Sequence, residues 1–115
     1  MPTDRILLEV GTGNDWHGGD YTKAAMRAVE DAIHHCSLPL LHTLNIDPRT
    51  MRVEVTIGVQ RPERVDPERV QAVLPEGIVT VHAVMGGLDI PNQGGGDVSV
   101  IANAAIVVHL DVGRR

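Results

Sequence analysis

The sequence has few aromatic residues. Aromatic side chains make up 2% of its 115 residues, and phenylalanine is absent. The core must therefore consist of Val, Ile, Leu, Ala and Met, and a chain of this length buries only about two-thirds of its unfolded surface. Because such a core is thin, we expect a homo-oligomer in which subunits share buried apolar area.

Cysteine, basic clusters and long apolar runs are also scarce. The single cysteine, Cys36, excludes an intramolecular disulfide and a cysteine-rich zinc site, and fits a reducing compartment. Ten basic residues against 15 acidic ones give a net charge of −5, so nucleic acid is not expected as a partner. No apolar run reaches the roughly 18 residues of a membrane span, and the first residues lack a signal-peptide pattern. We expect a cytoplasmic protein without a membrane partner.

Hydrophobic periodicity predicts one domain over residues 1–115. Hydrophobic residues are 43% and charged residues 22%, as in globular proteins. Period-two patterns predict strands, and three- and four-residue steps predict helices. The expected strands are residues 5–11, 52–59, 78–85 and 98–112, and the expected helices are residues 20–36 and 66–74. Residues 88–97, with Pro91 and three consecutive glycines, are expected to form a mobile loop.

This order, β-α-β-α-β-β, predicts an α/β (α+β) domain. The last strand is apolar on both faces, which is typical of a central strand. Helices can cover one face of the sheet, and a neighbouring subunit is expected on the other. The order resembles the chorismate-mutase-like fold, whose members commonly form trimers with sites between subunits. The resemblance implies a mixed four-stranded sheet with helices on one face, and it favours a trimer.

The richest chemistry lies in residues 11–20, GTGNDWHGGD, between the first strand and the first helix. Gly11, Gly13 and Gly18 are expected to shape a cofactor or ligand site, since glycine allows unusual torsions and close approach. In an extended segment, Asp15 and His17 point the same way, and this pair suits Zn, Mn or Fe(II). The alternative is that Asp15 accepts backbone N–H groups in a turn and His17 donates to a carbonyl.

The same glycines fail a test for a dinucleotide-binding fingerprint. Gly11 and Gly13 fit the pattern, but Trp16 stands at the third glycine position. A simple anion site at the start of the following helix stays open, although Asp20 there would oppose an anion.

The run GTGNDWHGGD resembles the GxGxDxHG signature of an uncharacterised conserved hypothetical family of bacteria and plants. Further matches are residues 22–25 (TKAA), residues 32–35 (AIHH), Pro39 and residues 103–105 (NAA). The resemblance covers nearly the whole chain. Since the family has no established activity, the resemblance implies membership and no mechanism.

A more distant resemblance concerns methylerythritol cyclodiphosphate synthase, which also has a GxGxDxH run after its first strand on a related trimeric fold. There the Asp and the His are metal ligands, which implies Asp15 and His17 here. The enzyme's third ligand lies in a segment without a counterpart in this sequence. Candidates by residue type are His34, His35 and His42, of which His35 shares a helix face with small alanines.

Other residues are candidates for supporting roles. Glu9 interrupts an apolar strand, either as an edge residue or as a general base. His34 and His35 could transfer protons, or could interact with the last carbonyls of their helix. Lys23 could hold an anionic group, or could be a solvated surface lysine. The glycine-rich segment 86–96 is expected to close over the pocket.

Together these features favour a small metal-dependent enzyme, a hydrolase or lyase acting on a small polar or anionic metabolite. In this hypothesis Asp15 and His17 hold a divalent metal, which polarises a substrate oxygen or activates water. The alternative is a homo-oligomer that binds a small ligand without catalysis.

Overall fold

A computed structural model describes residues 4–34, 51–74 and 77–110. Its elements are β1 (Asp4–Asp15), α1 (Tyr21–His34), β2 (Arg52–Val59), η2 (Pro62–Arg64), α3 (Pro67–Gln71), β3 (Ile78–Met85), β4 (Leu88–Pro91) and β5 (Val98–Leu110). Most elements therefore begin and end within a few residues of the bounds that the sequence patterns predict. No helix in these ranges is long and apolar enough to cross a membrane.

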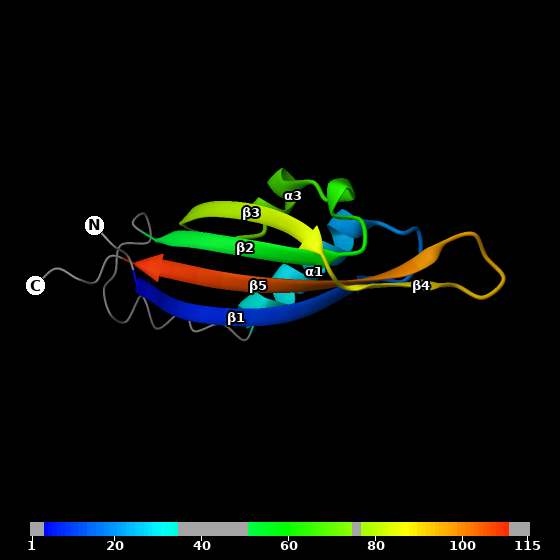
Figure 1. Ribbon diagram of the computed structural model, residues 1–115, viewed down its shortest axis with the longest axis horizontal. Helices are drawn as coiled ribbons and strands as arrows, with labels where there is room; N and C mark the ends of the chain where they lie inside the picture. Colours follow the sequence, from blue (N-terminus) through cyan, green and yellow to red (C-terminus); the bar gives the residue numbers. More distant parts are fainter. Residues whose placement is uncertain (1–3, 35–50, 75–76, 111–115) are drawn as a thin grey trace, which may run out of the picture.

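The strands form one mixed sheet in the order β1-β5-β2-β3, and β4 pairs with β5. β5 runs antiparallel to both β1 and β2, whereas β2 and β3 are parallel. Figure 1 shows the strands side by side, α1 behind them, and the β4–β5 hairpin projecting at one end. The fold class, a mixed α+β fold with a central last strand, is confirmed.

β5 takes the central position because both of its faces are suited to packing. Val100, Ala102, Ala104, Ile106 and Val108 are buried on the side of the helices. The core also contains Val53, Val55, Ile57 and Val59 of β2, and Ala24, Ala25, Ala28, Val29 and Ala32 of α1. The alanines of α1 let the helix axis approach the sheet closely, as their spacing indicates.

The expected end of the first strand at Gly11 is wrong, because β1 continues to Asp15. A Cβ atom at Gly11 would lie 2.3 Å from the Ala28 carbonyl oxygen, and one at Gly13 would lie 2.2 Å from the Ala28 nitrogen. The two glycines therefore admit the α1 backbone against the strand. A glycine in a strand interior often marks such a close approach, and these two glycines mark helix contact and not a turn.

The expected loop at residues 88–97 is also corrected. Leu88–Pro91 forms β4, which pairs with residues 98–101 of β5, so the sheet has five strands and not four. Pro91 is compatible with a strand because it stands at the end of β4, where no ladder donor is required. Only residues 92–97 form the connection, in which the Asn92 N–H donates to the Asp97 carbonyl.

The short helix α3 begins as its sequence predicts. The Asp66 side chain accepts a hydrogen bond from the Glu68 N–H at 3.1 Å, and Pro67 occupies the first turn. The preceding turn η2 was not predicted. Its residues Pro62–Arg64 connect β2 to α3. Arg64, together with Arg61 immediately before the turn, lies beside the start of α1.

Candidate functional site

The segment between β1 and α1 is held by its two acidic residues. Oδ2 of Asp15 accepts a hydrogen bond from the Asp20 N–H at 2.9 Å, and Oδ1 of Asp15 lies 3.6 Å from the Arg27 guanidinium. Asp20 in turn caps α1, accepting from the Lys23 N–H at 2.9 Å. Asp15 is only 5% exposed, so its carboxylate is committed to joining the strand to the helix.

His17 has a different partner. Its side chain is 83% exposed, and its Nδ1 lies 3.8 Å from Oδ2 of Asp97, at the end of the β4–β5 connection. The structure therefore does not bring the side chains of Asp15 and His17 together. The carboxylate that His17 approaches is that of Asp97. In the described ranges, no three side chains of His, Cys, Asp or Glu gather as a metal site. Metal binding by Asp15 and His17 stays a prediction.

The segment is also fastened to the β4–β5 hairpin. The Gly18 N–H donates to Oδ2 of Asp97 at 3.4 Å, while Asn92 and Ser99 both donate to the Trp16 carbonyl. Gly18 has φ +89°, a left-handed conformation that side chains rarely adopt. Glycine is thus required here for backbone geometry, and the chain can turn from the end of β1 toward α1.

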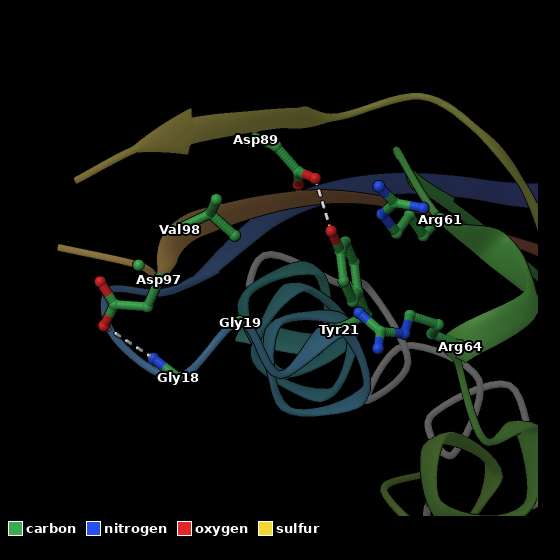
Figure 2. Close-up of a pocket in the computed structure, with 9 residues that line it drawn as sticks. Gly18, Gly19, Tyr21, Arg61, Arg64, Asp89, Asp97 and Val98 are labelled. Carbon is green, nitrogen blue, oxygen red and sulfur yellow. Dashed lines mark hydrogen bonds between the residues drawn. The ribbon is translucent and has the colours of Figure 1, made fainter.

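Beside this segment lies a cavity of about 320 Å³, which we call the arginine pocket. It is lined by Gly18 and Gly19, Tyr21, Arg61, Arg64, Asp89 and residues 96–98. Figure 2 shows the Tyr21 ring between Asp89 and the two arginines, with Asp97 and Gly18 on the other side. Four separate parts of the chain meet here: the start of α1, the turn η2, strand β4 and the start of β5.

Tyr21 is the buried centre of this pocket. It is 4% exposed, and its hydroxyl donates a short hydrogen bond of 2.5 Å to Oδ2 of Asp89. Burial, together with the hydrogen bond and the charge of Asp89, raises the pKa of Tyr21 above 10.0. The phenol therefore stays protonated at neutral pH and acts as a hydrogen-bond donor.

The arginines approach the same ring from the turn η2. The Arg64 guanidinium lies over the Tyr21 ring at 5.9 Å from its centroid. The turn is fastened to α1 by Thr22, whose hydroxyl donates to the Arg64 carbonyl and accepts from the Asp66 N–H. Within residues 4–34, 51–74 and 77–110, no carboxylate lies within ion-pair distance of Arg61 or Arg64. One side of the pocket therefore carries positive charge that no carboxylate of the described residues pairs with.

The carboxylates of the pocket are already engaged. Asp89 is bonded by Tyr21, and its second oxygen, Oδ1, is buried without a hydrogen-bond partner in the described part of the chain. Asp97 accepts hydrogen bonds from Asn92 and Gly18, which lower the pKa of its carboxyl below 3.8. Asp97 is therefore ionised at neutral pH, beside His17.

The predicted site residues divide into two groups. Gly18 lines the arginine pocket, and His17 reaches its rim through Asp97. Glu9, Lys23 and His34 do not line it, and His34 stands at the far end of α1, about 20 Å from Tyr21 at the helical rise of 1.5 Å per residue. Their proposed catalytic roles stay predictions.

Gly11 and Gly13, predicted to bind a cofactor, pack against α1 as described above. His35 and His42, candidates for a third metal ligand, lie outside the described residues.

Sequence reasoning missed Tyr21, Arg61, Arg64 and Asp89. None of them stands in a spacing that marks a site, and they meet only because η2 and β4 fold against the start of α1. The one available signal was the single tyrosine of the chain, placed directly after the glycine run.

Fold and pocket together define a two-layer mixed α+β protein with a small polar pocket beside a helix start. The chain belongs to the family described as Conserved hypothetical protein (Lin0512_fam), whose model matches residues 5–108. The expectation of an uncharacterised conserved family is thereby confirmed. The resemblance to methylerythritol cyclodiphosphate synthase stays a prediction.

The solved structures include a similar protein. It is a FtsZ-like protein of unknown function from Nostoc punctiforme PCC 73102, with 36% sequence identity and a TM-score of 0.85. The match covers 96% of this chain and 98% of that one. Comparison with curated proteins gives no match.

Proposed function

We propose that the protein binds a small anionic metabolite in the arginine pocket. The observation that carries this proposal is the pair Arg61 and Arg64, whose guanidinium groups border a cavity and have no carboxylate partner among the described residues. Guanidinium groups bind carboxylates and phosphates through paired, charge-assisted hydrogen bonds. An unneutralised pair at a cavity is therefore suited to an anion.

Two further features, a flat wall and the size of the cavity, support a small ligand. The rigid Tyr21 ring, held by Asp89 and by Arg64, supplies a flat wall. The volume of about 320 Å³ is at the lower end for small-molecule sites, which favours a metabolite smaller than a dinucleotide.

Binding can be measured by isothermal titration calorimetry with inorganic phosphate and with small mono- and dicarboxylates. Arg61→Gln and Arg64→Gln should each weaken binding of the best anion at least about tenfold, the loss of one charge-assisted contact. Arg69→Gln is the matched control, since Arg69 is exposed on α3 and does not line the pocket. If no anion binds, or if all three variants bind equally, the proposal is wrong.

The second candidate function is a metal-dependent hydrolase or lyase. It is favoured by the approach of His17 to Asp97, whose Nδ1 and Oδ2 atoms lie 3.8 Å apart at the rim of the arginine pocket. An imidazole and an ionised carboxylate are ligands that Zn, Mn and Fe(II) accept. His17 and Asp97 would hold the ion, which would polarise an oxygen of a ligand bound by the arginines.

Metal analysis of the purified protein, followed by titration with Zn²⁺ and Mn²⁺, tests this candidate. His17→Ala and Asp97→Asn should abolish stoichiometric binding, while His34→Ala, an exposed histidine at the far end of α1, should leave it unchanged. Asp15→Asn distinguishes the pair His17 and Asp97 from the pair Asp15 and His17 that the sequence predicts. It should abolish metal binding only if Asp15 is a ligand. Equal binding by all four variants contradicts both assignments.

A further inference from the structure

The sheet has one face that neither helix covers within the described ranges. Burial alternates along the strands, so Gly11 and Gly13 of β1 and Ala104 of β5 face α1. The residues between them, such as Thr12 and Asn103, point to the opposite side. Figure 1 views the molecule with the strands in front of α1. We call this opposite side the open face.

The open face carries large apolar side chains that are exposed. They come from three strands: Val10 (65% exposed), Ile78 (61%), Val84 (46%), Leu88 (55%) and Ile90 (46%). Trp16 is 65% exposed and borders a hollow on the same side with Ile90 and Ile101. Single exposed apolar residues are ordinary, but a group on one face marks an interaction site.

We propose that the open face packs against a second copy of this chain. The available area fits such an interface. Four strands of about eight residues cover roughly 26 by 19 Å, on the order of 500 Å² of flat area, at the usual strand spacings. The accessible area is larger than this flat area, because side chains project from the sheet and Leu88 and Ile90 of the β4–β5 hairpin extend the face. It therefore comes near the roughly 800 Å² per partner of a stable interface.

The charge distribution also favours a second copy. The chain carries a net charge of −5, so two copies repel one another unless they meet on neutral surface. At the centre of the open face is a shallow hollow of about 440 Å³, where Thr12, Thr56 and Asn103 lie among Val10, Val84 and Ala105. The acidic residue at its border, Asp31, accepts a hydrogen bond from the Thr12 N–H beyond the edge of β1. Apart from Asp31 at the border, no residue that lines this hollow has a charged side chain.

Charged side chains of the open face stand toward one end. Glu54 and His109 are neighbours there, with His109 Nε2 lying 2.7 Å from Glu54 Oε1. Arg52, exposed on the same side of β2 and paired in register with His109, places a positive charge near Glu54, so this end has no excess of one sign. A strongly charged macromolecule would find no complementary patch at the centre of this face, whereas an equally neutral copy fits it.

The outer edge of β1 is closed at the same level. Asp31 occupies the Thr12 N–H, and the Arg27 guanidinium donates to the Asn14 carbonyl at 2.7 Å. Strand-to-strand pairing of two copies is therefore obstructed at Thr12 and Asn14. Packing face to face, with sheets about 10 Å apart, would instead bury the exposed apolar groups and enclose the central hollow.

The oligomeric state of the full chain tests the proposal, by light scattering after gel filtration and by sedimentation over a wide concentration range. The wild-type protein should have a mass at least twice the 12.4 kDa of one chain. Val10→Asp and Val84→Asp should each reduce it to the monomer with an unchanged circular dichroism spectrum. Met85→Asp is the matched control, because Met85 is 69% exposed next to Val84 but points to the other side of β3.

Asn103→Asp keeps the size of the exposed Asn103 side chain and adds one charge at the centre of the open face. If either valine variant fails to fold, this variant tests the proposal in its place, and it should also be monomeric. A monomeric wild-type protein at every concentration overturns the proposal. Unchanged mass in the folded face variants overturns it too, and so does equal dissociation of Met85→Asp.

Discussion

The two faces of the sheet differ in how fully their apolar side chains are covered. On the helix side, Gly11 and Gly13 meet Ala24 and Ala28 of α1, and backbone packs directly against backbone. On the open face, Val10, Ile78 and Leu88 are more than half exposed. Large side chains such as Ile57 and Ile106 are fully buried on the helix side, next to these glycines. Close approach of α1 therefore determines where glycine and alanine stand, and coverage by the helices determines which large side chains are buried.

The largest effect is expected where the two layers touch. In Gly13→Val the new Cβ would lie 2.2 Å from the Ala28 nitrogen and 2.4 Å from the Ala24 carbonyl oxygen. Because the obstacle is helix backbone, the free energy of unfolding should fall by about 4 kcal/mol or more. Urea denaturation followed by circular dichroism measures this.

Gly96→Ala is the control, since a Cβ atom there meets nothing within 4 Å. It should change the free energy of unfolding by less than about 0.5 kcal/mol. Similar losses in both variants would mean that the glycines of β1 have no special packing role.

Isoleucines on the two faces give the next comparison. Ile57→Ala removes a fully buried side chain from β2 and should cost about 3 kcal/mol of unfolding free energy. Ile90→Ala removes one that is 46% exposed on the open face and should cost less than about 1 kcal/mol in dilute solution. A larger loss for Ile90→Ala under conditions where the chain is monomeric would contradict this account of the faces.

A smaller effect is expected at the junction of β1 with α1. Asp15→Ala removes the acceptor of the Asp20 N–H and the partner of Arg27, and should reduce the free energy of unfolding by about 1 to 2 kcal/mol. Asn14→Ala, the adjacent open-face position, should change it by less than about 0.5 kcal/mol. Thermal denaturation of both variants at one pH provides the comparison, and an equal change in both would exclude Asp15 as a structural anchor.

The smallest effect concerns Tyr21. Because the chain has a single tyrosine, absorbance of the phenolate during an alkaline titration reports this residue alone. Its midpoint should lie above 10.0, and Asp89→Asn should lower it by removing the charged hydrogen-bond acceptor.

The sign of the accompanying stability change follows from the raised pKa of Tyr21. The folded state binds the phenol proton more tightly than the unfolded chain does. The contribution is therefore fully present below pH 10 and is lost as pH rises through the raised pKa. A midpoint at or below 10.0 in the wild-type protein would contradict the buried Tyr21–Asp89 contact.

Strands and helices followed largely from periodicity. The alternation of Val53, Val55, Ile57 and Val59 predicted β2, and the apolar character of residues 98–112 predicted the central position of β5. Such features are visible in the local sequence because each buried position of a strand or helix requires an apolar residue. The errors arose at glycine and proline, whose meaning depends on what approaches them: Gly11 and Gly13 mark contact with a helix, and Pro91 ends a strand.

The pocket could not be predicted in the same way. His17 was expected to meet Asp15, two positions away, but the carboxylate beside it is Asp97, 80 positions along the chain. Similarly, Tyr21 is joined to Asp89 by the hairpin that folds over the start of α1. Such contacts depend on tertiary folding, for which a single sequence contains no local period.

The closed edge of β1 has a consequence for how copies of the chain accumulate. An exposed strand edge is a template on which further strands add without limit, as in amyloid fibres. Since Arg27 and Asp31 occupy backbone groups of β1 between Thr12 and Asn14, stacking of chains through this stretch is blocked. Two charged side chains of one helix thus hinder fibrillar growth at this end of β1.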